Sequence, residues 1–218
     1  VGVYARKDFG EVDPACHGLV RLPVAERAGL IWAVLRPGPP IDLDAFLCGY
    51  DSVLGQFDFA SWHLFARRSV AGPNWKIAYD GYLDFYHLPI LHKATFGTDL
   101  PNRALYDAYG PHQRVSFPNP RLLRFDELPE ANWDTRELLA GVWTIFPHVS
   151  IATFDAGARA VLVSQLFPGA SVAESVTVQS YALAKEPDPS ERDAAEKMFE
   201  LLGDHARPFR ARPFDVQL

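Results

Sequence analysis

The chain has 218 residues, of which 48% are hydrophobic and 22% are charged, and its formal net charge is −6. This composition is typical of a folded globular protein, and the length is sufficient for one large domain. A negative net charge without a cluster of basic residues argues against a nucleic-acid partner. The longest apolar runs, at residues 29–35 and 138–146, are much shorter than the roughly 20 residues that a membrane span requires. The sequence does not open with an export signal, so we expect a cytoplasmic protein without a membrane partner.

Two short apolar segments near the N-terminus, residues 19–24 and 29–35, predict strands that are separated by residues 25–28. The stretch Arg36-Pro37-Gly38-Pro39-Pro40 follows them and predicts a linker. About 35 residues are too few for an independent hydrophobic core. We therefore expect residues 1–40 to be the end of a truncated domain with its linker, and residues 41–218 to form the main domain.

Two segments after this linker have the apolar spacing of helices. Residues 41–50 place apolar side chains on one face, and residues 74–86 place aromatic side chains three and four positions apart. Residues 62–66, between these helices, predict a strand. Residues 110–114, which begin with glycine and proline, predict a turn that leads into a further strand.

The segment from residue 141 to residue 183 is rich in strand-forming residues. Turns that contain proline or glycine divide it into four expected strands, at residues 142–146, 149–154, 160–167 and 172–184. Short turns between long strands favour antiparallel pairing over parallel pairing through crossover helices.

A helix with an explicit start signal is expected after these strands. Asp188 can cap it, Pro189 suits its first position, and Glu191 completes a capping-box pattern. The expected apolar stripe consists of Ala194, Ala195, Met198, Phe199 and Leu202. An antiparallel sheet closed by an amphipathic C-terminal helix predicts the α+β fold class.

Asp84, His87 and His92 are the candidate functional residues, because they stand in an otherwise aromatic and apolar segment. On the predicted helix, Asp84 and His87 lie one turn apart on the same face. His87 and His92 are five positions apart, so on an ideal helix their rings would not converge. Pro89 disfavours helix at Leu88, so we expect the helix to break after His87 and His92 to turn back toward it.

Two imidazoles on either side of a broken turn can occupy adjacent positions of a metal site. The i, i+4 histidine pair of zinc proteases is absent. Two imidazoles and one carboxylate from a distant segment, with open positions left over, suit ferrous iron that activates dioxygen. Asp84 could accept a hydrogen bond from an imidazole or contact a partner surface. The alternative is a surface helix end that binds nothing, and the spacing alone leaves both interpretations open.

The motif Asn74-Trp75-Lys76, followed by Asp84-Phe85-Tyr86-His87 and then His92, resembles the catalytic domain of Rieske-type aromatic-ring-hydroxylating oxygenases, large (α) subunit. The segments that flank this motif carry the same resemblance. Residues 19–32 resemble the final strands of the family's Rieske domain. Residues 199–202 resemble the family's C-terminal helix.

This resemblance implies that His87 and His92 are the histidine ligands of a mononuclear ferrous iron. It implies that Asp84 bridges the iron site to the Rieske cluster of a neighbouring subunit. The implied fold is the helix-grip sheet, which agrees with the sheet and helix predicted above. An aromatic or related apolar substrate and dioxygen are the implied reactants. A ferredoxin or reductase is the implied electron donor, and a homotrimer or an α3β3 assembly is the implied oligomer.

The sequence departs from the family pattern in two respects. The Rieske signature, Cys-x-His followed by Cys-x-x-His, is missing, because Cys16-His17 and Cys48 lack its spacing. We therefore expect a [2Fe–2S] cluster only in a full-length protein. The third iron ligand of the family is an aspartate on the C-terminal helix, where Pro208 stands here. Asp204 and Asp215 are the substitute candidates.

Other residues admit two interpretations. A set of aromatic side chains could line a substrate pocket or form the sheet core: Trp62, Phe65, Trp143, Phe146, Phe154 and Phe167. His148 follows a proline and could point into a cavity or be a structural histidine. For the chain as a whole, the alternative to an oxygenase is a non-catalytic helix-grip module that binds an apolar ligand and has an incomplete iron site.

Overall fold

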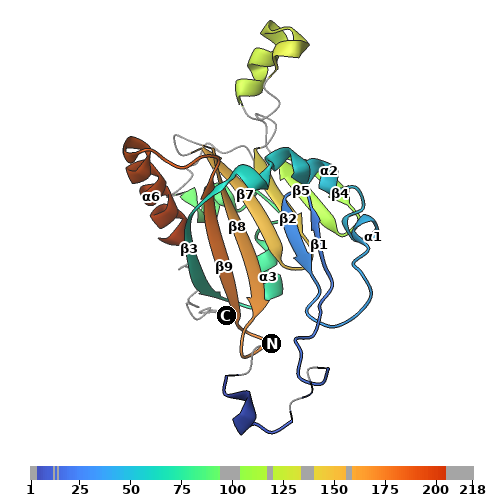
Figure 1. The fold of residues 1–218 in the computed structure, drawn as a ribbon. Coiled ribbons are helices and arrows are strands. Elements are labelled where there is room, and N and C mark those ends of the chain that lie inside the picture. The colour runs from blue at the N-terminus through green and yellow to red at the C-terminus, as the bar shows by residue number, and fades with distance from the viewer. Residues whose placement is uncertain are drawn as a thin grey trace, which may run out of the picture.

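The computed structural model describes residues 4–11, 13, 15–93, 104–116, 120–133, 140–155 and 159–204. These residues form a seven-stranded antiparallel sheet in the order β3-β9-β8-β7-β6-β5-β4 (Figure 1). The strands are β3 (His63–Gly72), β4 (Leu105–Tyr109), β5 (His112–Ser116), β6 (Gly141–Ile145), β7 (Val149–Asp155), β8 (Arg159–Pro168) and β9 (Ser175–Leu183). The sheet and the C-terminal helix confirm the predicted α+β fold class.

Among the described residues, the helices beside this sheet are short except for the last. The α-helices are α1 (Leu43–Leu47), α2 (Asp51–Leu54), α3 (Trp75–Asp80), α4 (Leu88–Leu91) and α6 (Pro189–Asp204). Five 3-10 turns are η1 (Arg6–Asp8), η2 (Gly55–Phe57), η3 (Phe59–Ser61), η4 (Pro120–Glu127) and η5 (Glu130–Asn132). Within the described part of the chain, no helix has both the length and the apolar character needed to span a membrane.

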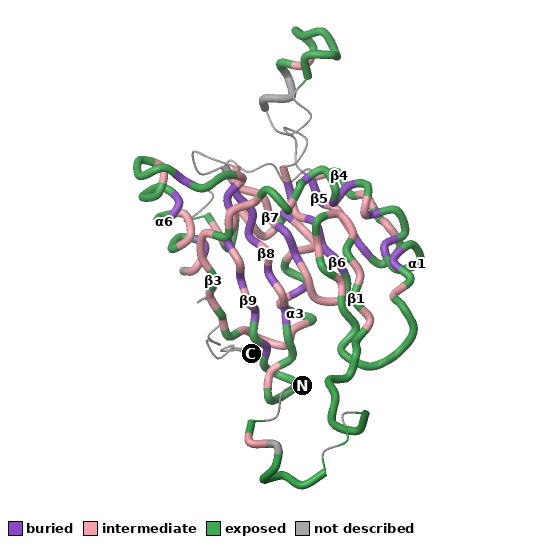
Figure 2. The backbone as a smooth tube through the Cα atoms, in the orientation of Figure 1, coloured by how far each residue is buried: buried purple, intermediate pink, exposed green. Residues whose placement is uncertain are grey.

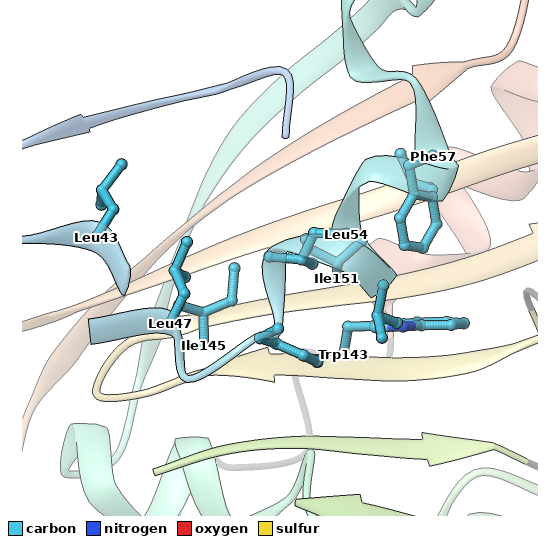
Figure 3. Close-up of a cluster of buried hydrophobic side chains, with 10 residues drawn as sticks. Leu43, Leu47, Leu54, Phe57, Trp143, Ile145 and Ile151 are labelled. Atoms are coloured by element: carbon cyan, nitrogen blue, oxygen red, sulfur yellow. The ribbon is translucent and has the colours of Figure 1, made fainter. Parts of the chain in front are cut away.

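One face of the sheet packs against α1 and α2 and forms the larger core (Figure 3). Its buried side chains are Leu43, Leu47, Tyr50, Val53, Leu54, Phe57, Trp143, Ile145, Ile151 and Val161. Trp143 is fully buried here, and its ring meets the edge of the Phe57 ring with centroids 4.9 Å apart. Figure 2 shows that the buried backbone follows the central strands, whereas much of α1 and α6 is exposed.

The opposite face packs against α6. Leu162, Tyr181 and Leu183 contact Ala195 and Leu202 of this helix. Every second residue of an antiparallel strand points to the same face, so the two cores lie on opposite sides of one sheet.

The start of α6 has the predicted capping box. The Asp188 carboxylate accepts hydrogen bonds from the Ser190 and Glu191 amides at 2.9 and 3.1 Å, and the Asp188 amide donates to Glu191 Oε2 at 3.2 Å. The predicted apolar stripe is correct except at Ala194, which is exposed.

The N-terminal hairpin differs from the predicted strands. β1 (Val24–Arg27) and β2 (Leu30–Ala33) pair directly, and the predicted strand at residues 19–24 is wrong. Ala28 and Gly29 both have positive φ, at 58° and 71°, which is the backbone of a two-residue hairpin turn. Ala28, Leu30 and Trp32 pack on the larger core. Arg27 forms salt bridges with Asp44 and Asp51 at 2.9 and 2.8 Å. The division of the chain at residue 40 stays a prediction.

The expected helix over residues 41–50 is shorter, because α1 ends at Leu47 and Cys48 adopts the left-handed conformation. The expected strand at residues 62–66 is the beginning of the longer β3. The four strands expected between residues 141 and 184 are confirmed, with β9 beginning at Ser175. The turn expected at residues 110–114 joins β4 to β5.

Candidate metal centre

The predicted helix over residues 74–86 is wrong in its second half. α3 begins at an Asn74 cap, whose side chain accepts from the Lys76 amide at 2.9 Å, and it ends at Asp80. Gly81 follows, and glycine costs about 1 kcal/mol relative to alanine inside a helix. The chain then continues through turns as far as residue 87. Asp84 and His87 are therefore placed by a turn and not by a helix.

Pro89 also has a different role from the predicted one. It stands in the first turn of α4, which begins at Leu88, directly after His87. Proline is tolerated there, because the first amides of a helix have no partner within the helix. The His92 amide donates to the Leu88 carbonyl at 2.9 Å and closes this short helix. His87 and His92 thus flank one helical turn.

The two imidazoles converge as predicted, although the cause is the short helix and not a break after His87. The centroids of the His87 and His92 rings lie 5.3 Å apart, and the ring planes are 72° apart. Both side chains are partly buried. The two rings are therefore close neighbours, as two imidazole ligands of one metal ion must be.

Asp84 binds His87 twice through one carboxylate oxygen. Asp84 Oδ1 accepts from the His87 amide at 3.2 Å and from His87 Nδ1 at 3.1 Å. A hydrogen bond donated by Nδ1 selects the tautomer whose Nε2 carries the lone pair, as a metal ligand requires. Partial burial raises the pKa of Asp84, but the hydrogen bonds from His87 outweigh it, so the pKa lies below its usual value. Asp84 is therefore a charged acceptor beside the His87 ring.

Comparisons with known proteins identify the family of this chain. Residues 59–209 match the family described as the ring hydroxylating alpha subunit, catalytic domain. The chain belongs to this family. This confirms the resemblance that the motif at residues 74–92 indicated.

Solved structures of a Rieske monooxygenase share the fold. The quaternary ammonium Rieske monooxygenase CntA in complex with L-carnitine has a TM-score of 0.71 at 16% identity, over 98% of this chain and 58% of that chain. The complex of CntA with the inhibitor MMV12 has a TM-score of 0.71 at 15% identity, over 94% of this chain and 54% of that chain. The chain therefore spans little more than half the length of these structures. No curated protein matches the chain.

The residues of this chain fit part of an iron site. His87 and His92 offer two imidazole donors, and Asp84 orients one of them. Among the described residues, no group of three histidine, cysteine or carboxylate side chains is arranged to hold a metal ion. The Asp204 side chain, Pro208 and Asp215 lie outside the described residues. The third ligand therefore stays a prediction.

The aromatic residues considered as pocket lining divide into two groups. Trp143 is buried in the larger core, and Phe65 and Phe154 pack on the core beneath α6, as the structural interpretation predicts. Phe146 and Phe167 are about half exposed. The Phe146 ring lies against the Tyr79 ring of α3, with centroids 6.1 Å apart.

Two histidines outside the metal centre have contacts that are typical of structural histidines. His148 lies beside the Phe167 ring, and burial lowers its pKa. His112 is 1% exposed, its Nε2 donates to the Phe46 carbonyl at 2.7 Å, and its Nδ1 accepts from the Phe146 amide at 3.1 Å. No local pattern predicts this role of His112, because its partners are 66 and 34 residues away.

Proposed function

We propose that this chain is the catalytic domain of an oxygenase that holds mononuclear ferrous iron between His87 and His92. The observation that carries the proposal is the convergence of these two rings, with Asp84 bonded to His87 Nδ1. Family membership supports it, because the match covers the whole segment that contains these residues. When bound, ferrous iron supplies the ability to activate dioxygen with electrons from a donor.

The chain's own residues orient and protect the metal ligands. Asp84 keeps the His87 proton on Nδ1 and fixes the plane of the ring, so that Nε2 keeps its lone pair. The turn of α4 sets the spacing between the two imidazoles, and partial burial of both limits their contact with water. Asp204 or Asp215 would complete the ligand set as the carboxylate of a two-histidine, one-carboxylate site.

The proposed substrate is an aromatic or related apolar small molecule. The family description supports ring hydroxylation, and the Phe146 and Tyr79 rings provide apolar surface beside α3. A quaternary ammonium compound is the competing substrate class, because CntA has been solved with L-carnitine and γ-butyrobetaine. Product formation from a benzoate-type ring, compared with that from L-carnitine, separates the two classes.

Electrons would come from a Rieske [2Fe–2S] cluster in the full-length protein, and a cytoplasmic ferredoxin or reductase would reduce that cluster. The proposed assembly is a homotrimer or an α3β3 oligomer in which Asp84 bridges two subunits. Asp84 suits this role, because its side chain is 48% exposed while Oδ1 is bonded to His87. The structure of a quaternary ammonium Rieske monooxygenase that gave insights into inter-subunit electron transfer supports this arrangement. Residues 1–40 would then be the end of the cluster-bearing domain.

Anaerobic loading with ferrous iron tests the proposal. We expect one iron per chain in the wild type and almost none in His87→Ala or His92→Ala. His17→Ala removes an exposed histidine and should bind iron like the wild type. A folded chain that binds no iron but binds aromatic ligands would favour the non-catalytic helix-grip module. The lack of a three-residue metal group among the described residues is the observation behind that alternative.

A further inference from the structure

A row of polar side chains crosses the sheet on the face that carries α6. The strand registers pair Gln113 with Thr144, Thr144 with Ser150, Ser150 with Ser164, Ser164 with Gln179, and Gln179 with Arg68. Residues paired directly across antiparallel strands point to the same face. Four members of the row are buried: Thr144, Ser150, Ser164 and Gln179. Burial of polar groups is costly unless they are hydrogen-bonded, so the partners of this row matter.

The face that carries this row lies against the segment that holds the metal centre. Tyr79 of α3 lies near Thr144, and Tyr82 lies near Ser164 and Gln179. Burial raises the pKa of both tyrosines, and these contacts partly oppose the rise. The row therefore lies beside α3 and the turn after it, although the buried Ser150 and Ser164 hydroxyls have no hydrogen-bond partner among the described residues.

Gln113 makes the contact nearest to the candidate metal ligands. Its side-chain amide donates from Nε2 to the Leu83 carbonyl at 3.2 Å, and Leu83 directly precedes Asp84. The backbone carbonyl of Gln113 accepts from the Tyr50 hydroxyl at 2.8 Å and from the Thr144 hydroxyl at 3.1 Å. Two side chains thus fix the backbone of Gln113, and Gln113 in turn holds the Leu83 carbonyl.

We propose that Gln113 is a positioning residue for the metal centre, because it fixes the peptide group that joins Leu83 to Asp84. The orientation of this peptide sets where the Asp84 carboxylate stands relative to the His87 amide and ring. Gln113 lies on β5 and reaches the turn from the sheet, so it links a rigid element to a segment without regular structure. This inference rests on the proposed iron site at His87 and His92.

Gln113→Met tests the inference, because methionine has a similar length but no amide donor. Gln165→Met is the matched control, since Gln165 lies on β8, three strands from β5 in the sheet order. Ferrous iron affinity is measured by anaerobic chelator competition on the full chain. Groups that orient metal ligands typically contribute 10- to 100-fold in affinity. We expect Gln113→Met to weaken binding about tenfold and Gln165→Met to leave it unchanged.

A measurement without metal keeps the inference testable if iron does not bind. The His87 amide donates to Asp84 Oδ1, so its hydrogen exchange reports the position of the carboxylate. We expect faster exchange at this amide in Gln113→Met than in the wild type or Gln165→Met. If Gln113→Met does not fold, Gln113→Asn is used in both measurements, because its side-chain amide is one methylene shorter.

The outcomes separate this inference from the proposed function. If folded Gln113→Met has the same iron affinity and the same His87 amide exchange rate as the wild type, the proposed role of Gln113 is refuted. This holds even if His87→Ala loses iron. A wild type that binds no iron, or a His87→Ala variant that keeps it, would refute the proposed function. In that case His87 exchange alone would decide whether Gln113 positions Asp84.

Discussion

Replacing His112 by alanine should destabilise the fold strongly. The imidazole is 1% exposed and joins β5 to α1 and to the turn after β6 through its two hydrogen bonds. In His112→Ala, the Phe46 carbonyl and the Phe146 amide lose their partner, at about 1–3 kcal/mol for each buried group. The ring also stacks on Tyr50, with centroids 5.6 Å apart and an interplanar angle of 7°. We expect a loss of about 3 kcal/mol or more in the free energy of unfolding.

Thermal and urea unfolding followed by circular dichroism measure this loss. For a chain of this size, about 3 kcal/mol corresponds to a decrease in Tm of roughly 10 °C. His17→Ala is the control, because His17 is an exposed histidine in the N-terminal segment. A His112→Ala variant that is as stable as His17→Ala would refute the view that His112 ties these elements together.

The same residue predicts a pH dependence of stability. Burial lowers the pKa of His112 from 6.5, and the hydrogen bond to Phe46 opposes the shift only in part. The folded chain therefore binds fewer protons at this site than the unfolded chain. The stabilisation that neutral His112 contributes is complete above its ordinary pKa of 6.5. It is lost as the pH falls through the lowered pKa of the folded chain. The unfolding free energy should decline less steeply below about pH 6.5 in His112→Ala than in the wild type. Equal slopes would contradict this assignment.

The remaining predictions concern the metal centre, the last helix and the missing cluster. In a version that carries the Rieske cluster, Asp84→Asn should keep its iron at saturating metal and lose oxygenation by orders of magnitude, measured as single-turnover product. Intact activity would contradict the bridging role. Asp188→Ala should lower the free energy of unfolding by about 1 kcal/mol in urea, because the cap of α6 is removed. An unchanged value would show that the cap does not contribute. The isolated chain should show no [2Fe–2S] absorbance after reconstitution, and a cluster that does form would refute the expectation from Cys16-His17 and Cys48.

Much of the sheet and the site motif could be predicted, because both depend on local sequence. Strand-forming residues and the Pro- and Gly-containing turns identified β6 to β9. The capping signals at Asp188 identified α6. The spacing of Asp84, His87 and His92 left a metal site open, the family resemblance favoured it, and the structure brings the two rings together.

The helix over residues 74–86 could not be predicted correctly, because its aromatic periodicity continues after the helix ends. Tyr79 points from α3 to the sheet, and Tyr82 reaches the same face from the turn after Gly81. Both positions therefore look helical in the sequence. Gln113 and His112 were missed for another reason, since their contacts join residues 30 to 66 positions apart. Local patterns carry no information about such pairs.

Anomalous diffraction at the iron edge, on crystals loaded anaerobically with ferrous iron, shows where the metal binds. We expect one strong iron peak in contact with both the His87 and His92 rings, with Asp84 still bonded to His87 Nδ1. Crystals of His87→Ala grown under the same conditions should lack this peak. No peak at these two rings in the loaded wild type, or a peak elsewhere on the chain, would contradict the account.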